Sequence, residues 1–152
     1  EEIEKLETEH ATAPHLRTLQ KALAKDITIR VHSETDYNSA IEASQILFSG
    51  TLDDLAKLSE ELFLDIFDGV PQFEISKNEL QNGISIIDLL AEKTQVFPSK
   101  GETKKMIQGG GVLINKTKVE DVELKISASH LINNKYILIQ KGKRNYFILK
   151  TN

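Results

Sequence analysis

The segment 98–118 reads PSKGETKKMIQGGGVLINKTK, and its pattern decides the fold that we expect for the second half of the chain. Ser99 and Glu102 form a capping-box pattern, which predicts a helix that begins after Ser99 and reaches Gln108. Three glycines then stop the helix, because glycine adopts the positive φ that helix ends favour. The apolar run 112–114 predicts a short strand that leads into a polar turn. A short helix followed by a short strand is typical of a small α+β domain.

Downstream of this segment, the sequence predicts a β-hairpin. Strand patterns at 136–140 and 145–150 flank the loop KGKR at 141–144, which is the clearest hairpin signal in the chain. The two strands and the strand at 112–114 predict a short antiparallel sheet.

The first half of the chain predicts helices. Apolar residues three or four positions apart form one stripe, which consists of Leu16, Leu19, Leu23, Ile27 and Val31. A second helix is expected over 36–48, with Gly50 as its stop. Capping signals at 51–54 and 76–79 predict two short helical turns, and an apolar pattern predicts another helix over 84–94. The fold class is therefore α+β, with a helical domain at 1–72 and a small mixed domain at 73–152.

Charge is distributed unevenly between the two halves of the chain. The net charge of the whole sequence is −4, but residues 1–83 carry −10 and residues 84–152 carry +6. A basic half of this kind is a sequence signal for a nucleic-acid partner or an anionic surface. The alternative is a chance distribution of solvated charges, and charge by itself leaves both interpretations open.

Several classes of protein are excluded by what the sequence lacks. There is no cysteine, so disulfides, thiol nucleophiles and cysteine-bound zinc are ruled out. No apolar run approaches the roughly 20 residues of a membrane span. His32 and Glu34 do not form an HExxH zinc pattern, and neither a phosphate loop nor a G-x-S-x-G motif occurs. We therefore expect no catalytic centre, no metal and no membrane contact. The acidic N-terminus is unlike a signal peptide, and a cytoplasmic location is expected.

The basic residues of the second half are the candidate functional residues. They gather on the predicted helix, on the turn after the short strand, and on the hairpin loop: Lys100, Lys104, Lys105, Lys116, Lys118, Lys141, Lys143 and Arg144. If these elements converge on one face, the lysines form an electrostatic footprint for a phosphate backbone. Ser99 adds the free amides of a helix N-terminus, which suit an anion. The aromatic residues nearby are candidates either for stacking on unpaired bases or for core packing: Phe97, Tyr136, Tyr146 and Phe147.

The segment 85–122 resembles the alpha-L RNA-binding module, which was first described in a ribosomal small-subunit protein. The shared features are an apolar helix, a serine before a basic helix, a Gly-Gly-Val step, an asparagine and a second short strand. They fall in this order at 86–90, Ser99, 110–112, Asn115 and Val119. The resemblance implies an RNA-binding role for the second domain, with Asn115 among its site residues.

Nearly the whole chain resembles the C-terminal region of bacterial tyrosyl-tRNA synthetases. The matching segments include 19–24, 40–50, 98–102 and 141–147. The resemblance implies that residues 1–72 complete the helical anticodon-binding region and that residues 73–152 are the appended alpha-L domain. It implies a tyrosine-specific tRNA as the partner, held by its variable arm and its anticodon side. The parent enzyme would use ATP with magnesium and dimerise through its catalytic domain.

The synthetase's HIGH-like and KMSKS-like catalytic motifs do not occur in these residues, so the fragment is expected to be non-catalytic and to bind no cofactor itself. Lys100 and Gly101 also depart from the family, in which many modules carry an arginine after the serine. Lysine contacts phosphate as a point charge and lacks the bidentate fork of arginine. Two alternatives stay open: a stand-alone alpha-L-type protein acting on another structured RNA, and a protein-interaction module whose acidic half binds a basic partner.

Overall fold

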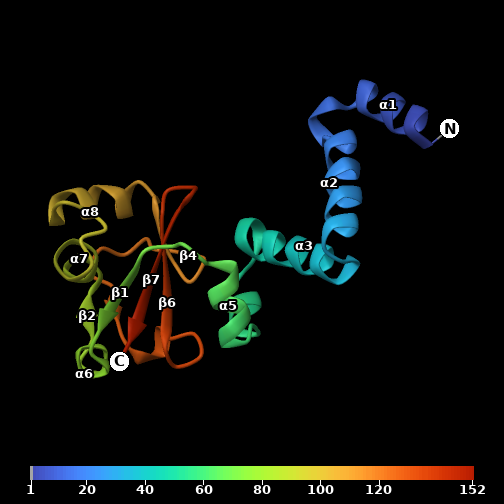
Figure 1. Cartoon of the computed structure of the whole chain (residues 1–152). Helices are drawn as coiled ribbons and strands as arrows, with labels where there is room; N and C mark the ends of the chain where they lie inside the picture. The colour runs from blue at the N-terminus through green and yellow to red at the C-terminus, as the bar shows by residue number, and fades with distance from the viewer. Residues whose placement is uncertain (1) are drawn as a thin grey trace. The chain divides into compact units, whose positions relative to one another are not determined.

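The computed structural model describes residues 2–152, which form two compact units (Figure 1). The first unit comprises residues 1–45 and the second comprises residues 46–152. The sequence placed the domain boundary at 72/73, and that boundary stays a prediction. No helix in the described part of the chain combines the length and the apolar character that crossing a membrane requires.

The first unit is helical, as the periodicity predicted. It contains α1 (Glu2–Thr12), the 3-10 turn η1 (Pro14–Leu16), α2 (Thr18–Val31) and most of α3 (Glu34–Ser49). No side chain between residues 3 and 45 is buried. The apolar stripe of α2 is exposed, and Leu23 and Val31 keep 61% and 69% of their surface accessible. These helices therefore carry apolar faces without a core of their own.

The second unit contains short helices, and α4, α5, α6 and α8 begin at side-chain caps. Their bounds are α4 (Leu52–Ala56), α5 (Glu60–Ile66), α6 (Lys77–Gln81), α7 (Ile86–Asp88), the π-helical η2 (Leu89–Lys93), α8 (Lys100–Gln108) and the 3-10 turn η3 (Ala128–His130). Thr51 with Asp54 forms a complete capping box at α4. The predicted helix over 84–94 begins only at Ile86, because Ile84 and Ser85 form a short strand. Its last turn widens, so that the Thr94 amide donates to Leu89 O.

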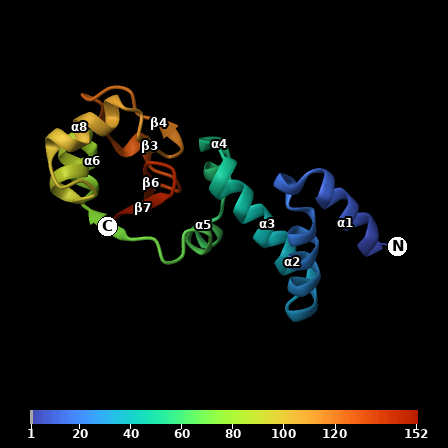
Figure 2. The same ribbon diagram turned by 90° about the horizontal axis from the view of Figure 1, so that it is seen from above.

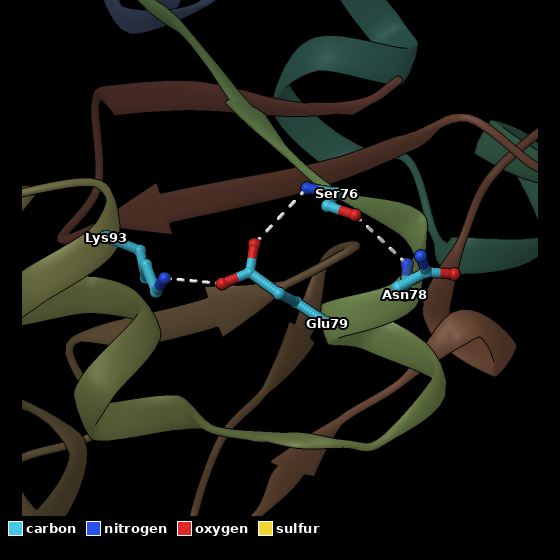
Figure 3. A network of polar contacts seen from close by, with 4 residues as sticks. All are labelled: Ser76, Asn78, Glu79 and Lys93. Carbon is cyan, nitrogen blue, oxygen red and sulfur yellow. Dashed lines mark hydrogen bonds and ion pairs between the residues drawn. The ribbon is translucent and has the colours of Figure 1, made fainter.

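The capping box of α6 also joins two elements (Figure 3). Ser76 accepts a hydrogen bond from the amide of Asn78, and Glu79 accepts one from the amide of Ser76. The same Glu79 carboxylate pairs with Lys93 at the end of η2. This hydrogen bond and ion pair lower the pKa of Glu79 and raise that of Lys93. One carboxylate therefore caps its own helix and holds a neighbouring helix beside it.

A five-stranded sheet forms the centre of the second unit, in the order β1-β7-β6-β3-β4. The strands are β1 (Gln72–Ile75), β3 (Val112–Ile114), β4 (Thr117–Lys118), β6 (Tyr136–Lys141) and β7 (Asn145–Thr151). The predicted hairpin is confirmed, with Lys141 opposite Asn145. The expected antiparallel sheet gains an unpredicted member, because β1 lies parallel to β7. A separate small ladder pairs β2 (Ile84–Ser85) with β5 (Lys125–Ile126).

Both faces of the sheet are covered, so the unit has three layers (Figures 1 and 2). One face, which includes Ile137 and Leu149, packs against the helical segments 77–93 and α8 in the larger core cluster. The other face, which includes Leu138 and Ile148, packs against α5 and the residues around it through Phe63 and Phe67. Alternate strand residues therefore serve two cores, as expected for a sheet that is buried on both sides.

Burial corrects part of the expectation for aromatic residues. Phe97 is fully buried and Tyr136 keeps 2% of its surface accessible, so neither ring can stack on a nucleobase. Tyr136 stacks on Phe63 at 5.4 Å between ring centroids, and its hydroxyl donates to Glu60 Oε1 at 2.7 Å. Phe147 packs against the larger core. The core-packing alternative is the correct one for these three residues.

Candidate nucleic-acid interface

The glycine segment 109–111 links the elements that carry basic residues. The Gly109 amide closes the last turn of α8 by donating to Lys105 O at 2.9 Å. Gly110 adopts a φ of +69°, which turns the chain from the helix toward β3. The amide of Gly142, in the β6–β7 loop, donates to Gly111 O at 2.7 Å. Figure 1 shows this loop beside the coil that leaves α8. The C-terminal end of α8 and the hairpin loop are therefore neighbours.

Lys118 joins this group through its aliphatic stem. A Cβ atom added at Gly110 would lie 2.3 Å from Lys118 Cε and 2.7 Å from Lys118 Nζ. The stem of Lys118 therefore lies directly over Gly110, a position that is open only because the residue there is glycine. The side chain of Lys118 is 55% exposed, and its one described ion pair, with Glu120, has a length of 3.7 Å.

Five of the predicted basic residues are exposed on elements that meet at the glycine segment, and we call them the basic rim: Lys104, Lys105, Lys118, Lys143 and Arg144. Lys104 and Lys105 lie in the second half of α8. Lys143 and Arg144 lie in the hairpin loop beside Gly142. Within residues 2–152, the structure gives no ion pair for any of these four. The basic rim therefore presents ammonium and guanidinium groups that are available to an anion.

Lys100 and Ser99 lie at the opposite end of α8 and are occupied within the chain. Lys100 Nζ pairs with Asp88 at 2.7 Å and with Glu92 at 2.8 Å. The hydrogen bonds to Asp88 and then Glu92 raise the pKa of Lys100 above its usual range. Ser99 caps α8, because its hydroxyl accepts a hydrogen bond from the Glu102 amide at 3.2 Å. A phosphate at this end would have to compete with two carboxylates.

Asn115 is a buried bridge in the structure. It keeps 4% of its surface accessible, and its Oδ1 accepts a hydrogen bond from the Leu138 amide at 2.8 Å. Its Nδ2 donates to His130 O. Its side chain thus satisfies two backbone groups from separate segments, and an RNA contact by this side chain would leave both groups unpaired.

Lys116 and Lys141 point toward the protein. Lys141 Nζ donates to Val96 O at 3.0 Å and lies 4.4 Å from the centroid of the Phe97 ring. Lys116 Nζ donates to Leu47 O and to the Tyr146 hydroxyl. The ten predicted site residues are thus divided by the structure: five form the basic rim, and five have partners within the second unit.

Sequence reasoning missed the residues that hold the site together. Gly110 was interpreted as a helix stop and as part of the Gly-Gly-Val step, and the space that it provides for Lys118 was missed. Asp88 and Glu92 were missed as partners of Lys100, and the signal available was their spacing of four residues on one helical pattern. In the part of the chain that the structure describes, no three His, Asp or Glu side chains lie close enough together to hold a metal ion.

Lys118 also lines a cavity, together with residues that carry carboxylates. The cavity is half-open, has a volume of about 740 Å³ and lies between α4 and the loops around η3. Its lining includes the apolar residues Ile114, Val119 and Ile132, and the charged or polar residues Asp53, Glu120, Asp121, Lys118 and His130. Three carboxylates against one lysine in the lining make this cavity less favourable for a phosphate backbone than the basic rim is. The basic rim is therefore the better candidate for an anionic polymer.

Known proteins resemble this chain over almost all of its length. The family model of the tyrosine–tRNA ligase SYY-like C-terminal domain matches residues 63–149. A tyrosine–tRNA ligase of Bacteroides thetaiotaomicron is 53% identical over 150 residues, which cover 98% of this chain and 35% of that protein. A tyrosine–tRNA ligase of Cytophaga hutchinsonii is 56% identical over 155 residues, which cover 100% of this chain and 36% of that protein. The chain thus spans about a third of the length of these relatives.

A solved structure supports the fold independently. The solution structure of a tyrosyl-tRNA synthetase C-terminal domain superposes with a TM-score of 0.51 at 23% identity, covering 64% of this chain and 94% of that one. The expectation of an α+β fold of this type is confirmed. The family model covers more than half of the chain, and its match includes α8, the glycine segment and the hairpin. The chain therefore belongs to the family of tyrosine–tRNA ligase SYY-like C-terminal domains.

Proposed function

We propose that this chain is the tRNA-binding C-terminal region of a tyrosine–tRNA ligase, and that it positions tyrosine-specific tRNA for aminoacylation by a catalytic domain elsewhere in the longer protein. The observation that carries the proposal is the basic rim: five exposed cationic residues on three elements that meet at the glycine segment 109–111. Family membership supports the choice of RNA in this proposal, and the exposed basic rim supports the choice of surface.

The binding mechanism is electrostatic and positional. Lysine and arginine side chains neutralise phosphates, and the released counterions favour association. Phosphate contacts fix the register and orientation of the RNA, while the shape of the folded RNA decides which molecule fits. When the body of the tRNA is held at this surface, its acceptor end is already oriented toward the active site. The chemical step then loses less translational and rotational entropy. The long variable arm and the anticodon side are the parts of the tRNA that we propose as contacts.

The proposal extends to the longer protein. Its catalytic part would use ATP with magnesium and form the homodimer, whereas residues 1–152 bind tRNA and perform no chemistry. The protein acts in the cytoplasm, where tRNA is charged. The exposed apolar faces of the first unit support this extension, because apolar patches of this kind often mark sites of contact with other protein.

Titration against tyrosine tRNA with and without its variable arm tests the proposal. Intact tRNA should bind more tightly than the truncated form and more tightly than a generic RNA hairpin of equal length. Equal affinity for all three would favour the stand-alone alternative, in which the same module acts on another structured RNA. Absence of any RNA retention at low salt would favour the protein-interaction alternative.

A charge-matched pair of double variants locates the surface. Lys104→Ala with Lys105→Ala removes two cations of the basic rim. Lys57→Ala with Lys77→Ala removes two exposed lysines outside it. The first variant should lower tRNA affinity about tenfold or more at low salt, if each lost phosphate contact is worth about 1 kcal/mol. The second variant should bind as the unmodified chain does. Equal losses in both variants would show that net charge matters and that the basic rim does not.

A further inference from the structure

The last turn of α3, residues 46–49, ends with a carbonyl group that the helix does not satisfy. The final helical hydrogen bond runs from Gly50 N to Ile46 O at 3.1 Å. The next amide, that of Thr51, donates to Asp54 Oδ2 at 2.8 Å as part of the cap of α4. Leu47 O therefore lies beyond the helical hydrogen bonds, at the negative end of the helix dipole.

Two side chains contact this carbonyl, one from the β3–β4 turn and one from β7. Lys116 Nζ donates to Leu47 O, and the Tyr146 hydroxyl donates to the same oxygen at 3.0 Å. Lys116 Nζ also donates to the Tyr146 hydroxyl at 3.1 Å and lies 4.6 Å from the centroid of the Tyr146 ring. A cation near the last carbonyls of a helix is stabilising because it opposes the helix dipole. Lys116 is also half-buried, and its ammonium group is engaged on the protein side.

Lys116 lies in a turn whose backbone conformation disfavours a side chain. Asn115 and Lys116 form the two-residue turn between β3 and β4, with φ values of 49° and 66°. Such turns strongly prefer glycine at the second position, because a side chain there is strained. A lysine in this conformation is less favourable than a glycine. The two-residue connection fixes this conformation, and from it the Lys116 side chain reaches Leu47 O.

Tyr146 is held by the second core of the unit. Its ring lies 5.9 Å from Phe67 between centroids, and Leu47 packs against the same cluster. The ring therefore packs in the hydrophobic cluster on the sheet face that includes Leu138 and Ile148, and its hydroxyl donates to Leu47 O at the end of α3. Lys118, only two residues after Lys116, instead extends over Gly110 and is part of the basic rim.

We propose that Lys116 and Tyr146 are positioning residues, which cap the C-terminal end of α3 and hold residues 46–49 on the sheet, and that Lys116 contacts no phosphate when RNA binds. The capping part stands on the geometry above. The part about phosphate rests on the proposed function. The proposal separates two lysines of one turn: Lys116 fixes the protein, and Lys118 is available to the RNA.

Amide hydrogen exchange in the full 152-residue chain tests the capping part. Lys116→Met keeps the length and the strained backbone but removes the charge. We expect the amides of residues 47–50 to exchange about 2- to 5-fold faster, which corresponds to the loss of a helix-end cation. Tyr146→Phe keeps the ring, removes the hydroxyl and should have the same effect in smaller measure. Lys104→Met, in α8, should leave these amides unchanged. Unchanged exchange in both the Lys116 and Tyr146 variants would overturn the capping role.

The salt dependence of RNA affinity tests the phosphate part. Each phosphate contact contributes about 0.7 to 0.9 to the log–log slope. Lys104→Met should reduce the slope by that amount, whereas Lys116→Met should leave it unchanged. A reduced slope for Lys116→Met would show that Lys116 binds phosphate and would overturn this part. If the unmodified chain binds no RNA, the proposed function and the phosphate part fail together, while the exchange result still decides the capping part.

Discussion

Asn115 connects three parts of the second unit through one buried amide. Its side chain joins the β3–β4 turn to the backbone of His130 and of Leu138. Because a buried group without a partner loses its hydration with no compensation, this side chain is structural in the conformation described. Residues with the same charge or polarity thus differ in role according to what they touch, as Lys116 and Lys118 also do.

Removal of the Asn115 amide should destabilise the fold. Asn115→Ala leaves Leu138 N and His130 O unpaired, and each buried unpaired group costs about 1–3 kcal/mol. We expect the free energy of unfolding to fall by at least about 2 kcal/mol, measured by urea denaturation. Asn145→Ala, at an exposed asparagine, is the control and should change stability by less than about 0.5 kcal/mol. Unchanged stability with reduced RNA affinity would instead restore Asn115 as an RNA contact.

Glu60 predicts a dependence of stability on pH. Hydrogen bonds from Lys135 and then Tyr136 lower the pKa of this carboxyl below its usual 4.5. Since the pKa is lower in the folded state, the interaction stabilises the fold above about pH 4.5, and this contribution is lost as the pH falls below that value. Glu60→Gln should weaken the acid dependence of the melting temperature between pH 5 and pH 3. An identical pH profile in the variant would contradict this role.

At the scale of elements, the link between α8 and β3 carries the candidate site. Gly110 permits both the positive φ of the link and the position of Lys118. Gly69 provides a matched comparison, because its φ is +74° and an added Cβ there would meet nothing within 4 Å. The two glycines therefore share the backbone strain of a substitution but differ in the contact with a basic side chain.

Gly110→Ala and Gly69→Ala should separate these effects. Both substitutions should lower stability by about 1–2 kcal/mol, because alanine is strained at a positive φ. Only Gly110→Ala should also lower RNA affinity, since the new methyl group displaces Lys118. Melting curves and RNA titrations of both variants provide the measurement. Equal RNA affinity in the two variants would remove Lys118 from the interface.

Elements with local signals were predictable from the sequence, and non-local ones were not. The caps at Thr51, Ser76 and Ser99 depend on residues three positions away, so the pattern identifies them directly. Strand β1 was missed because it is four residues long and pairs with β7 more than 70 positions later. Lysines that cap or pair within the fold look the same in sequence as lysines that face solvent. For this reason the charge pattern identified the basic half but could not separate Lys116 and Lys141 from the basic rim.

At the scale of the whole molecule, the two units differ in what stabilises them. The second unit has two hydrophobic clusters, one on each face of its sheet. The first unit has no buried side chain between residues 3 and 45. Isolated helices of about 10–16 residues are marginal in water, because helix nucleation is costly and packing supplies most of the stability. The apolar faces of the first unit thus lack packing partners within that unit.

Truncation should reveal this difference. Residues 46–152 alone should keep a cooperative thermal transition and the dispersed amide spectrum of a folded domain. A peptide of residues 1–45 should show weak helical circular dichroism and no cooperative transition. A cooperative transition in the peptide would contradict the inference that its apolar faces lack packing partners within the unit.

The salt dependence of tyrosine-tRNA affinity tests the central claim most directly, because it counts the phosphates that the chain neutralises. If the basic rim contacts roughly five phosphates, the plot of log affinity against log salt should have a slope of about −3 to −5. The variant that lacks Lys104 and Lys105 should have a slope shallower by about 1.4 to 1.8. A flat response in the unmodified chain, or equal slopes in the two proteins, would contradict an RNA interface at the basic rim.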